Sequence, residues 1–223
     1  MDKDFLNKVY GYSKVKNELF VIRDWYLNAD AMGEKKKLLP KGILLYGEPG
    51  CGKTQIMREY SKTFNYPVFV IEGKDDNVHE EVCGIYEKAK QEKNAIVIID
   101  ELDRLIDKDE KLVRIIMSQL DGFDSNTSIL TIATCNRYFS LPDALIREGR
   151  FDRHFCIGNT DGEMEDIIRL FSKDANINLS DEDIMELAMC FDICTTGEIK
   201  AIFNNASLRY GDNCTIDDII NIA

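Results

Sequence analysis

The stretch Gly47-Glu48-Pro49-Gly50-Cys51-Gly52-Lys53-Thr54 fits the pattern Gly-x4-Gly-Lys-Thr of a phosphate-binding loop. An apolar run at residues 43–45 precedes it and reads as a strand, and residues 55–64 follow it and read as a helix. In this context glycines let backbone N–H groups face inward around a phosphate, and the positive end of the helix adds attraction. Lys53 is expected to reach the β- and γ-phosphates, and Thr54 to place its hydroxyl on Mg²⁺. The stretch therefore predicts a nucleotide site rather than a glycine-rich turn that binds nothing.

Composition narrows the class of protein. The chain has 223 residues, 44% of them hydrophobic and 30% charged, which suits one large or two small globular domains. It has no run of ~20 apolar residues and no basic-then-apolar N-terminal segment, so we expect neither a transmembrane segment nor a secretory signal. Seven cysteines form no Cys-x-x-Cys pair, so we expect reduced thiols and a cytoplasmic protein. The net charge of −12 lies mostly after residue 158, where 14 acidic and 4 basic residues give −10, which argues against nucleic acid as the main partner.

Apolar runs that read as strands alternate with helical patterns along the first 158 residues. The expected strands are residues 43–45, 67–71, 95–99, 129–133 and 154–157. The second and third are continuous apolar runs, which predicts burial on both faces. The expected helices are residues 13–28, 55–64, a segment starting at Asn77-x-x-Glu80, and part of 102–120 after a polar segment, with a loop at 28–40. This alternation is typical of a parallel α/β sheet, in which ligands bind at the carboxyl ends of the strands.

Only helical patterns follow residue 158. We therefore predict a boundary there, between an α/β domain at residues 1–158 and a helical domain at residues 159–223. Ser180-x-x-Asp183 and Thr215-x-x-Asp218 are expected to start helices, because a side-chain oxygen at the first position caps a backbone N–H three residues on. Thr196 is expected to begin another helix between them.

Polar side chains follow two of the expected strands. Asp100 and Glu101 come directly after the run 95–99, and Asn136 follows the run 129–133. Asp100 is placed to hold the shell of a Mg²⁺ ion, and Glu101 to act as general base on the water that attacks a γ-phosphate. Asn136 is either an amide that orients this water or an ordinary turn asparagine. Because these residues and the phosphate loop all fall at strand carboxyl ends, the sequence predicts a hydrolysing site.

A second stretch, residues 141–153, carries arginines at every third position: Arg147, Arg150 and Arg153. An arginine can stabilise the negative charge of phosphoryl transfer, which is worth ~10³–10⁵ in rate. The spacing leaves open whether these arginines serve their own site or a neighbour's, or pair on the surface with Glu148 and Asp152.

With these motifs the chain resembles the AAA+ ATPases (ATPases associated with diverse cellular activities), and within them the AAA subfamily proper. The resemblance runs from Val9 to the C-terminus as a single module. It rests on motifs that match Walker A, Walker B, sensor 1 and the second region of homology, at residues 47–54, 96–103, 131–137 and 141–153. Residues 121–123 resemble the inter-subunit signalling segment, and residues 195–199 sit where the lid motif is expected.

The resemblance implies a P-loop NTPase fold, with a parallel five-stranded sheet of order 5-1-4-3-2 and a C-terminal four-helix lid. It implies that ATP or ADP with Mg²⁺ binds between the two parts. The nucleotide is expected to contact Val9, Tyr10, Gly11, Glu48, Pro49, Gly50, Cys51, Gly52, Lys53, Thr54, Gln55, Thr196 and Gly197. The resemblance also implies a homo-oligomeric ring, usually a hexamer. Arg150 and Arg153 would then be fingers that act on the ATP of the neighbouring subunit.

The sequence also departs from the pattern of relatives that thread polypeptide. Residues 73–76 contain no aromatic where those relatives carry an aromatic-apolar-glycine loop, and the second pore segment at 105–111 is short. Ser172 stands where the lid usually has a histidine near adenine, and we expect no substrate-recruiting domain in this chain. We therefore expect Mg²⁺-dependent ATP hydrolysis by a ring that remodels a protein or assembly partner. The alternative is a nucleotide-controlled assembly module with slow hydrolysis and no threading. A DNA-associated, clamp-loader-like role is disfavoured by the acidic lid.

Overall fold

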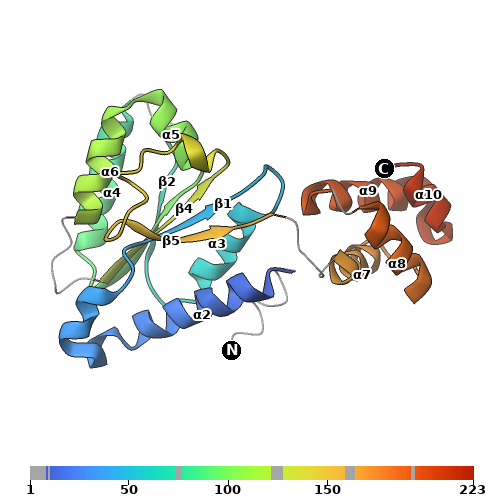
Figure 1. The fold of residues 1–223 in the computed structure, drawn as a ribbon, viewed down its shortest axis with the longest axis horizontal. Helices are drawn as coiled ribbons and strands as arrows, with labels where there is room; N and C mark the ends of the chain where they lie inside the picture. The colour runs from blue at the N-terminus through green and yellow to red at the C-terminus, as the bar shows by residue number, and fades with distance from the viewer. Residues whose placement is uncertain (1–8, 10, 74–76, 122–127, 159–163, 192–193) are drawn as a thin grey trace.

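Five parallel strands form one sheet in the order β2-β3-β4-β1-β5 (Figure 1). This computed structural model describes residues 9, 11–73, 77–121, 128–158, 164–191 and 194–223. The strands are β1 (Gly42–Tyr46), β2 (Val68–Ile71), β3 (Asn94–Ile99), β4 (Ser128–Cys135) and β5 (Phe151–Cys156). Read from the other edge, the order is 5-1-4-3-2, which confirms the prediction. The phosphate-binding stretch follows β1, which lies between β4 and β5 in the sheet.

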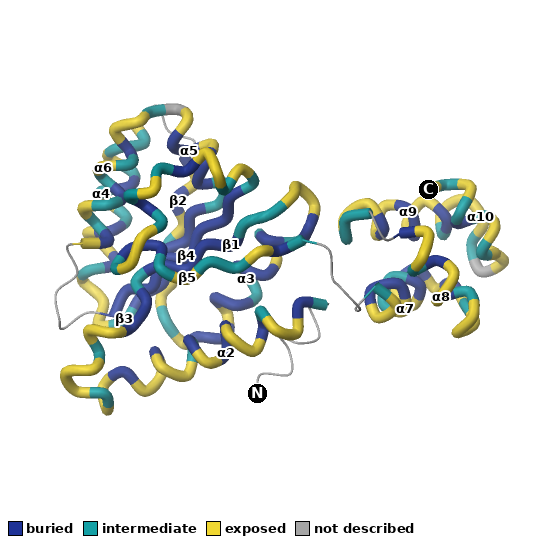
Figure 2. Tube along the Cα trace, in the orientation of Figure 1, coloured by how far each residue is buried: buried dark blue, intermediate teal, exposed yellow. Residues whose placement is uncertain are grey.

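Helices cover both faces of the sheet (Figure 1). On one face lie α2 (Ser13–Leu27) and α3 (Lys53–Lys62), and on the other α4 (Val78–Lys90), α5 (Leu102–Lys108) and α6 (Lys111–Asp121). Alternate residues of each central strand enter the two cores, so Ile43 packs with α2 and α3, whereas Leu44 packs with α4 to α6. Figure 2 shows that the central strands are the most deeply buried part of the sheet and its covering helices. Two-sided burial explains why their sequences are continuous apolar runs.

Strand β2 is only half buried, so the prediction of burial on both faces was wrong for residues 67–71. Val68 and Val70 are 41% and 46% exposed, whereas Ile71 is buried. The cause is the strand's place at the edge of the sheet, where the core with α4 covers one face and the other stays open. An apolar run alone does not distinguish an edge strand from a central one.

Three other local predictions need correction. Residues 28–40 are not a loop but contain a 3₁₀ segment, η1 (Ala29–Leu38), with a break at Gly33. The region 102–120 holds two helices, α5 and α6, rather than a polar segment and one helix. The last strand begins at Phe151, three residues before the expected start, because Phe151 is a fully buried core residue paired with Gly42.

Four helices form a separate group with its own core (Figure 1). They are α7 (Met164–Asp174), α8 (Asp181–Cys190), α9 (Thr196–Tyr210) and α10 (Ile216–Ile220). The predicted starts at Ser180 and Thr215 are confirmed, because each residue forms a capping box with the acidic residue three positions on. Thr196 is the first residue of α9, and Thr195 caps it in the same way. The Asn77 side chain, in contrast, makes no capping hydrogen bond at the start of α4.

The predicted boundary between residues 158 and 159 adjoins residues 159–163, which lie outside the described part of the chain, and it stays a prediction. In the described ranges, no helix has both the length and the apolar character needed to span a membrane. Two short 3₁₀ segments complete the described elements, η2 (Tyr138–Ser140) and η3 (Gly211–Asn213).

Candidate nucleotide site

The phosphate-binding loop connects β1 to α3, and its backbone needs glycine. Gly47, Gly50 and Gly52 have φ angles of 150°, 86° and 89°, which residues with a Cβ atom rarely adopt. At Gly47 space is also decisive, because a Cβ atom there would lie 1.9 Å from the carbonyl oxygen of Ile157. Helix α3 begins at Lys53 without a side-chain cap, so its first N–H groups are available to an anion.

The ammonium group of Lys53 is held inside this loop. It donates hydrogen bonds to the carbonyl oxygens of Gly47, at 2.7 Å, and Glu48, at 2.6 Å. Lys53 is buried, and this burial lowers the pKa of its amine. A phosphate in the loop would supply the negative charge that this desolvated cation lacks.

Asp100 lies at the carboxyl end of β3, opposite the start of α3. Its Oδ1 atom accepts hydrogen bonds from the hydroxyl of Thr54, at 2.9 Å, and from the hydroxyl of Thr134, at 2.6 Å. The two residues predicted to hold Mg²⁺ are therefore in direct contact, although 46 positions separate them in the chain. The hydroxyl and carboxylate oxygens suit Mg²⁺, which prefers hard oxygen ligands.

Glu101 is the residue before α5, makes no side-chain capping hydrogen bond, and has a left-handed backbone with φ 54° and ψ 55°. Its N–H donates to Oγ1 of Thr134 at 2.8 Å, and its carboxylate pairs with Arg104 at 2.5 Å. The side chain of Glu101 is partly exposed and lines the same pocket as Lys53 and Thr54. Glu101 thus faces the space next to the phosphate loop.

Asn136 follows β4, and its backbone is held by a carboxylate from α5. Asp103 is 2% exposed and accepts hydrogen bonds from the N–H of Asn136, at 3.4 Å, and of Arg137, at 3.1 Å. Arg137 also pairs through its guanidinium with Asp103 and Asp107. The Asn136 side chain lines the pocket with Glu101. Asp103 matters for the shape of the site, yet it was not among the site residues that the sequence predicted.

These side chains line a polar pocket of about 750 Å³. Its walls are Pro49, Gly50, Gly52, Lys53, Thr54, Gln55, Arg58, Glu59, Lys62, Glu101, Thr134, Asn136 and Lys200. The structure therefore brings the phosphate loop, Glu101 and Asn136 to one cavity. Its size and polar lining suit the phosphate groups and metal of a nucleotide.

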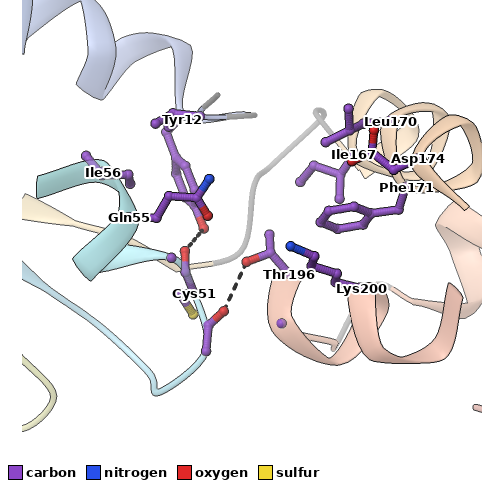
Figure 3. A pocket seen from close by; sticks show the side chains of 14 residues that line it. Tyr12, Cys51, Gln55, Ile56, Ile167, Leu170, Phe171, Asp174, Thr196 and Lys200 are labelled. Atoms are coloured by element: carbon purple, nitrogen blue, oxygen red, sulfur yellow. Dashed lines mark hydrogen bonds between the residues drawn. The ribbon is translucent and has the colours of Figure 1, made fainter. Parts of the chain in front are cut away.

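A second, smaller pocket of about 150 Å³ also borders the phosphate loop, and both parts of the chain contribute apolar as well as polar side chains to its walls (Figure 3). Val9, Tyr12 and Ile56 contribute from the sheet side, and Ile167 and Phe171 from the lid. Such a slot between apolar side chains suits a nucleotide base. The two pockets share residues of the phosphate loop, so one nucleotide could occupy both.

Tyr12 is one of several residues of this base-side pocket that the sequence did not predict. Its hydroxyl donates to the carbonyl oxygen of Cys51 at 3.0 Å (Figure 3). It also donates to the carbonyl oxygen of Gly158 at 2.9 Å, and so ties the phosphate loop to the end of β5. Of the predicted base contacts, Val9 lines the pocket and Gly11 does not. Tyr10 lies outside the described residues.

Two groups of the lid donate hydrogen bonds to the same carbonyl oxygen of the phosphate loop. The N–H of Gly197 and the hydroxyl of Thr196 both donate to Gly50, at 3.0 Å and 3.1 Å. One turn further along α9, Lys200 lines both pockets, and Figure 3 shows its side chain beside the gap between lid and loop. This lysine was also missed by the sequence reading.

The three arginines of residues 141–153 lie elsewhere, and none of them is among the described residues that line the two pockets. Arg150 is 6% exposed, and its guanidinium binds both carboxylate oxygens of Asp121, at 3.1 Å and 2.7 Å, and the carbonyl of Ala144. This pairing lowers the pKa of Asp121. Arg153 is exposed and lies over the ring of Trp25, 5.9 Å from its centre. Glycine and phenylalanine of the predicted signalling segment, residues 122–123, lie outside the described part of the chain.

Sheet order, phosphate loop and the residues gathered around it define a nucleotide-binding protein of the P-loop class. The sequence profile described as "ATPase family associated with various cellular activities (AAA)" matches residues 43–159. The chain therefore belongs to the AAA family, and its ATPase domain is an ATP hydrolase.

Curated relatives agree with this assignment. The chain is 32% identical over 217 residues to "ATP-dependent zinc metalloprotease FtsH" of Ureaplasma parvum, an alignment that covers 90% of this chain and 30% of the relative. It is 31% identical over 229 residues to the protein of the same name from Mycobacterium bovis, which covers 93% of this chain and 30% of the relative. A relative of the same name from Acaryochloris marina is 34% identical over 172 residues, which covers 69% of this chain and 26% of the relative. The chain thus spans about a third or less of the length of the curated relatives it matches.

Proposed function

We propose that this chain hydrolyses ATP with Mg²⁺ as a subunit of a ring, and that the ring remodels a protein or assembly partner. The observation that carries the hydrolytic part is the contact of Thr54 with Asp100, which places the two predicted metal ligands together beside Glu101. Lys53 and Asn136 line the same pocket.

Thr54 and Asp100 would hold the metal, since a hydroxyl and a carboxylate oxygen already lie 2.9 Å apart at the mouth of the phosphate loop. Mg²⁺ bound there would neutralise charge on the phosphates. Lys53 would leave the carbonyl oxygens of Gly47 and Glu48 and donate to phosphate oxygens, which offer it a full negative charge.

Hydrolysis itself would use Glu101 and Asn136. Glu101 takes a proton from water while the water oxygen bonds to the γ-phosphorus, and the bond from that phosphorus to the β-phosphate oxygen breaks. The products are ADP and inorganic phosphate. Asn136 orients the water without competing for the metal, and Asp103 fixes the backbone from which the amide projects.

The arginines support a site shared between subunits. Arg153 is exposed, is not among the described residues lining either pocket of its own chain, and would exchange only its contact with the Trp25 ring for a neighbouring subunit's phosphate. Arg150 would first have to exchange Asp121 for that neighbour's phosphate, because its guanidinium is already paired. We therefore propose a homo-oligomeric ring, with six subunits as in many relatives of this family, in which Arg153 acts in trans.

The rate of ATP hydrolysis per subunit, measured against protein concentration, tests the shared site. The rate should rise steeply as subunits assemble, and Arg153→Ala should lower it by ~10³-fold while nucleotide binding persists. Arg209→Ala, which removes an exposed arginine from α9, is the matched control and should leave the rate unchanged. A rate per subunit that is constant over the assembly range, or unaffected by Arg153→Ala, would contradict the shared site.

The remodelling role is supported by the ATP dependence that the names of the relatives state. The absence of an aromatic in residues 73–76 favours a second candidate, a nucleotide-controlled assembly module that does not thread polypeptide. An electron cryomicroscopy reconstruction of the ring with ATP and an unfolded polypeptide separates the two. Extended polypeptide in the pore supports remodelling by threading, and an empty pore supports the assembly module. We further propose that the protein acts in the cytoplasm.

A further inference from the structure

The hydroxyl of Thr134 joins two functional residues that the sequence treats separately. Thr134 lies on β4, and its side chain is 1% exposed. Its Oγ1 atom donates to Oδ1 of Asp100 at 2.6 Å and accepts from the N–H of Glu101 at 2.8 Å. One buried hydroxyl therefore links the proposed metal ligand and the proposed base to the neighbouring strand.

Both links fix a geometry that the chain would not otherwise hold. Asp100 receives two hydroxyl donors on the same oxygen, from Thr54 and Thr134, which limits the rotation of its carboxylate. Glu101 has a left-handed backbone, which is unfavourable for a residue with a Cβ atom. The hydrogen bond from its N–H to Thr134 satisfies a partly buried donor in this conformation and so stabilises it.

Packing alone does not require this hydroxyl, and another threonine of the same strand shows the difference. Thr131 is equally buried, but its Oγ1 lies 3.0 Å from the hydroxyl of Tyr86 in the core with α4, on the opposite face of the sheet. A valine at either position keeps the shape of the side chain and removes the hydroxyl. Only at position 134 does the hydroxyl face the nucleotide pocket.

We propose that Thr134 is a positioning residue for ATP hydrolysis, which aims the carboxylate of Asp100 and holds the backbone of Glu101 through one hydroxyl. The inference rests on the proposed function, because it assumes that Asp100 holds Mg²⁺ and that Glu101 acts on water. Thr134 itself touches neither water nor phosphate in this role.

Two measurements on Thr134→Val test the proposal. The first is the Mg²⁺ concentration that gives half-maximal binding of ADP, followed by the fluorescence of a labelled ADP, which requires no turnover. This Mg²⁺ concentration should rise about 10-fold, because the variant loses the hydrogen bond to the charged carboxylate of Asp100, the proposed metal ligand. The Kd for labelled ADP in EDTA should stay within about 2-fold of the wild type, because no metal is then bound. The second is kcat, which should fall about 10- to 100-fold at saturating Mg²⁺.

Thr134→Ser supplies the rescue, since it keeps the hydroxyl and removes only the methyl group. It should restore the Mg²⁺ dependence and most of kcat. Thr131→Val is the matched control, and it should lower the melting temperature while the Mg²⁺ dependence stays that of the wild type. The proposal is overturned if Thr134→Val keeps the wild-type Mg²⁺ dependence and kcat, or if Thr134→Ser is as impaired as Thr134→Val. A wild-type chain that binds ADP without regard to Mg²⁺ would instead overturn the proposed function itself.

Discussion

Replacing Gly197 by alanine should weaken nucleotide binding without destabilising the lid. Gly197 lies in the first turn of α9, and its N–H donates to the carbonyl oxygen of Gly50 at 3.0 Å. A Cβ atom added there would lie 3.0 Å from that oxygen and 3.3 Å from the Cα of Gly50. The lid would therefore have to move away from the phosphate loop by a few tenths of an ångström.

The expected magnitude follows from the two hydrogen bonds at this contact. Both the N–H of Gly197 and the hydroxyl of Thr196 reach the same oxygen, and each bond contributes ~0.5–1.5 kcal/mol. Losing part or all of them amounts to ~1–3 kcal/mol, or about 5- to 150-fold in affinity for a nucleotide held between lid and loop. The helix itself is affected in the opposite direction, because alanine is a better helix former than glycine by up to ~1 kcal/mol.

The assay is a titration with labelled ADP, together with thermal unfolding of the same samples. Gly84→Ala is the matched control, because Gly84 lies in α4 with nothing within 4 Å of an added Cβ atom. Gly84→Ala should raise the melting temperature and leave ADP binding unchanged, whereas Gly197→Ala should raise the Kd for ADP at an equal or higher melting temperature. Wild-type ADP affinity in Gly197→Ala would refute the reasoning that the lid closes on Gly50.

Three further predictions concern separate parts of the chain. Lys200→Met should raise the KM for ATP about 2- to 5-fold with little change in kcat, since an exposed amine adds modest attraction to phosphate, and steady-state kinetics checks this. The hydrogen bonds from Ser180 lower the pKa of Asp183 in the folded lid. This capping box therefore stabilises the lid at pH values above the unfolded pKa of ~3.9, and the stabilisation is lost as the pH falls through the lower folded pKa. Thermal unfolding followed by circular dichroism should therefore give a slightly lower melting temperature at pH 2.5 than at pH 7, and Asp183→Asn should reduce this difference. Gly47→Ala should destabilise the chain by ~3 kcal/mol or more in urea unfolding, because its Cβ atom would overlap the carbonyl oxygen of Ile157.

The strand order and the phosphate loop could be predicted because their signals are local. A glycine-rich loop between an apolar run and a helix is a property of one short stretch, and the alternation of strands and helices restricts the possible topologies. Asp100, Glu101 and Asn136 could be found in the same way, since they lie within the first few residues after an apolar run that forms a strand. The structure confirms the resulting sheet and brings these residues to one edge.

Residues that act through a neighbouring strand could not be found from the sequence. Thr134 reads as one more strand residue until β3 and β4 pair and bring it to Asp100, 34 positions away. Asp103 reads as a helix-surface carboxylate until α5 packs against the end of β4. The pairing of Arg150 with Asp121 likewise depends on how close the end of α6 comes to the start of β5, which the motif does not encode.

Two measurements on Glu101→Gln test the assignment of the hydrolytic site. Chemical quench gives the rate of single-turnover ATP hydrolysis, and the retention of radiolabelled ATP gives the affinity for ATP. Glutamine keeps the shape of the side chain and cannot accept the proton of the attacking water. The variant should therefore bind ATP with the affinity of the wild type, because the phosphate loop and Lys53 are unchanged, and should hydrolyse it ~10²- to 10⁴-fold more slowly. Hydrolysis by Glu101→Gln at the wild-type rate would contradict the role of Glu101 as the base and with it the proposed mechanism.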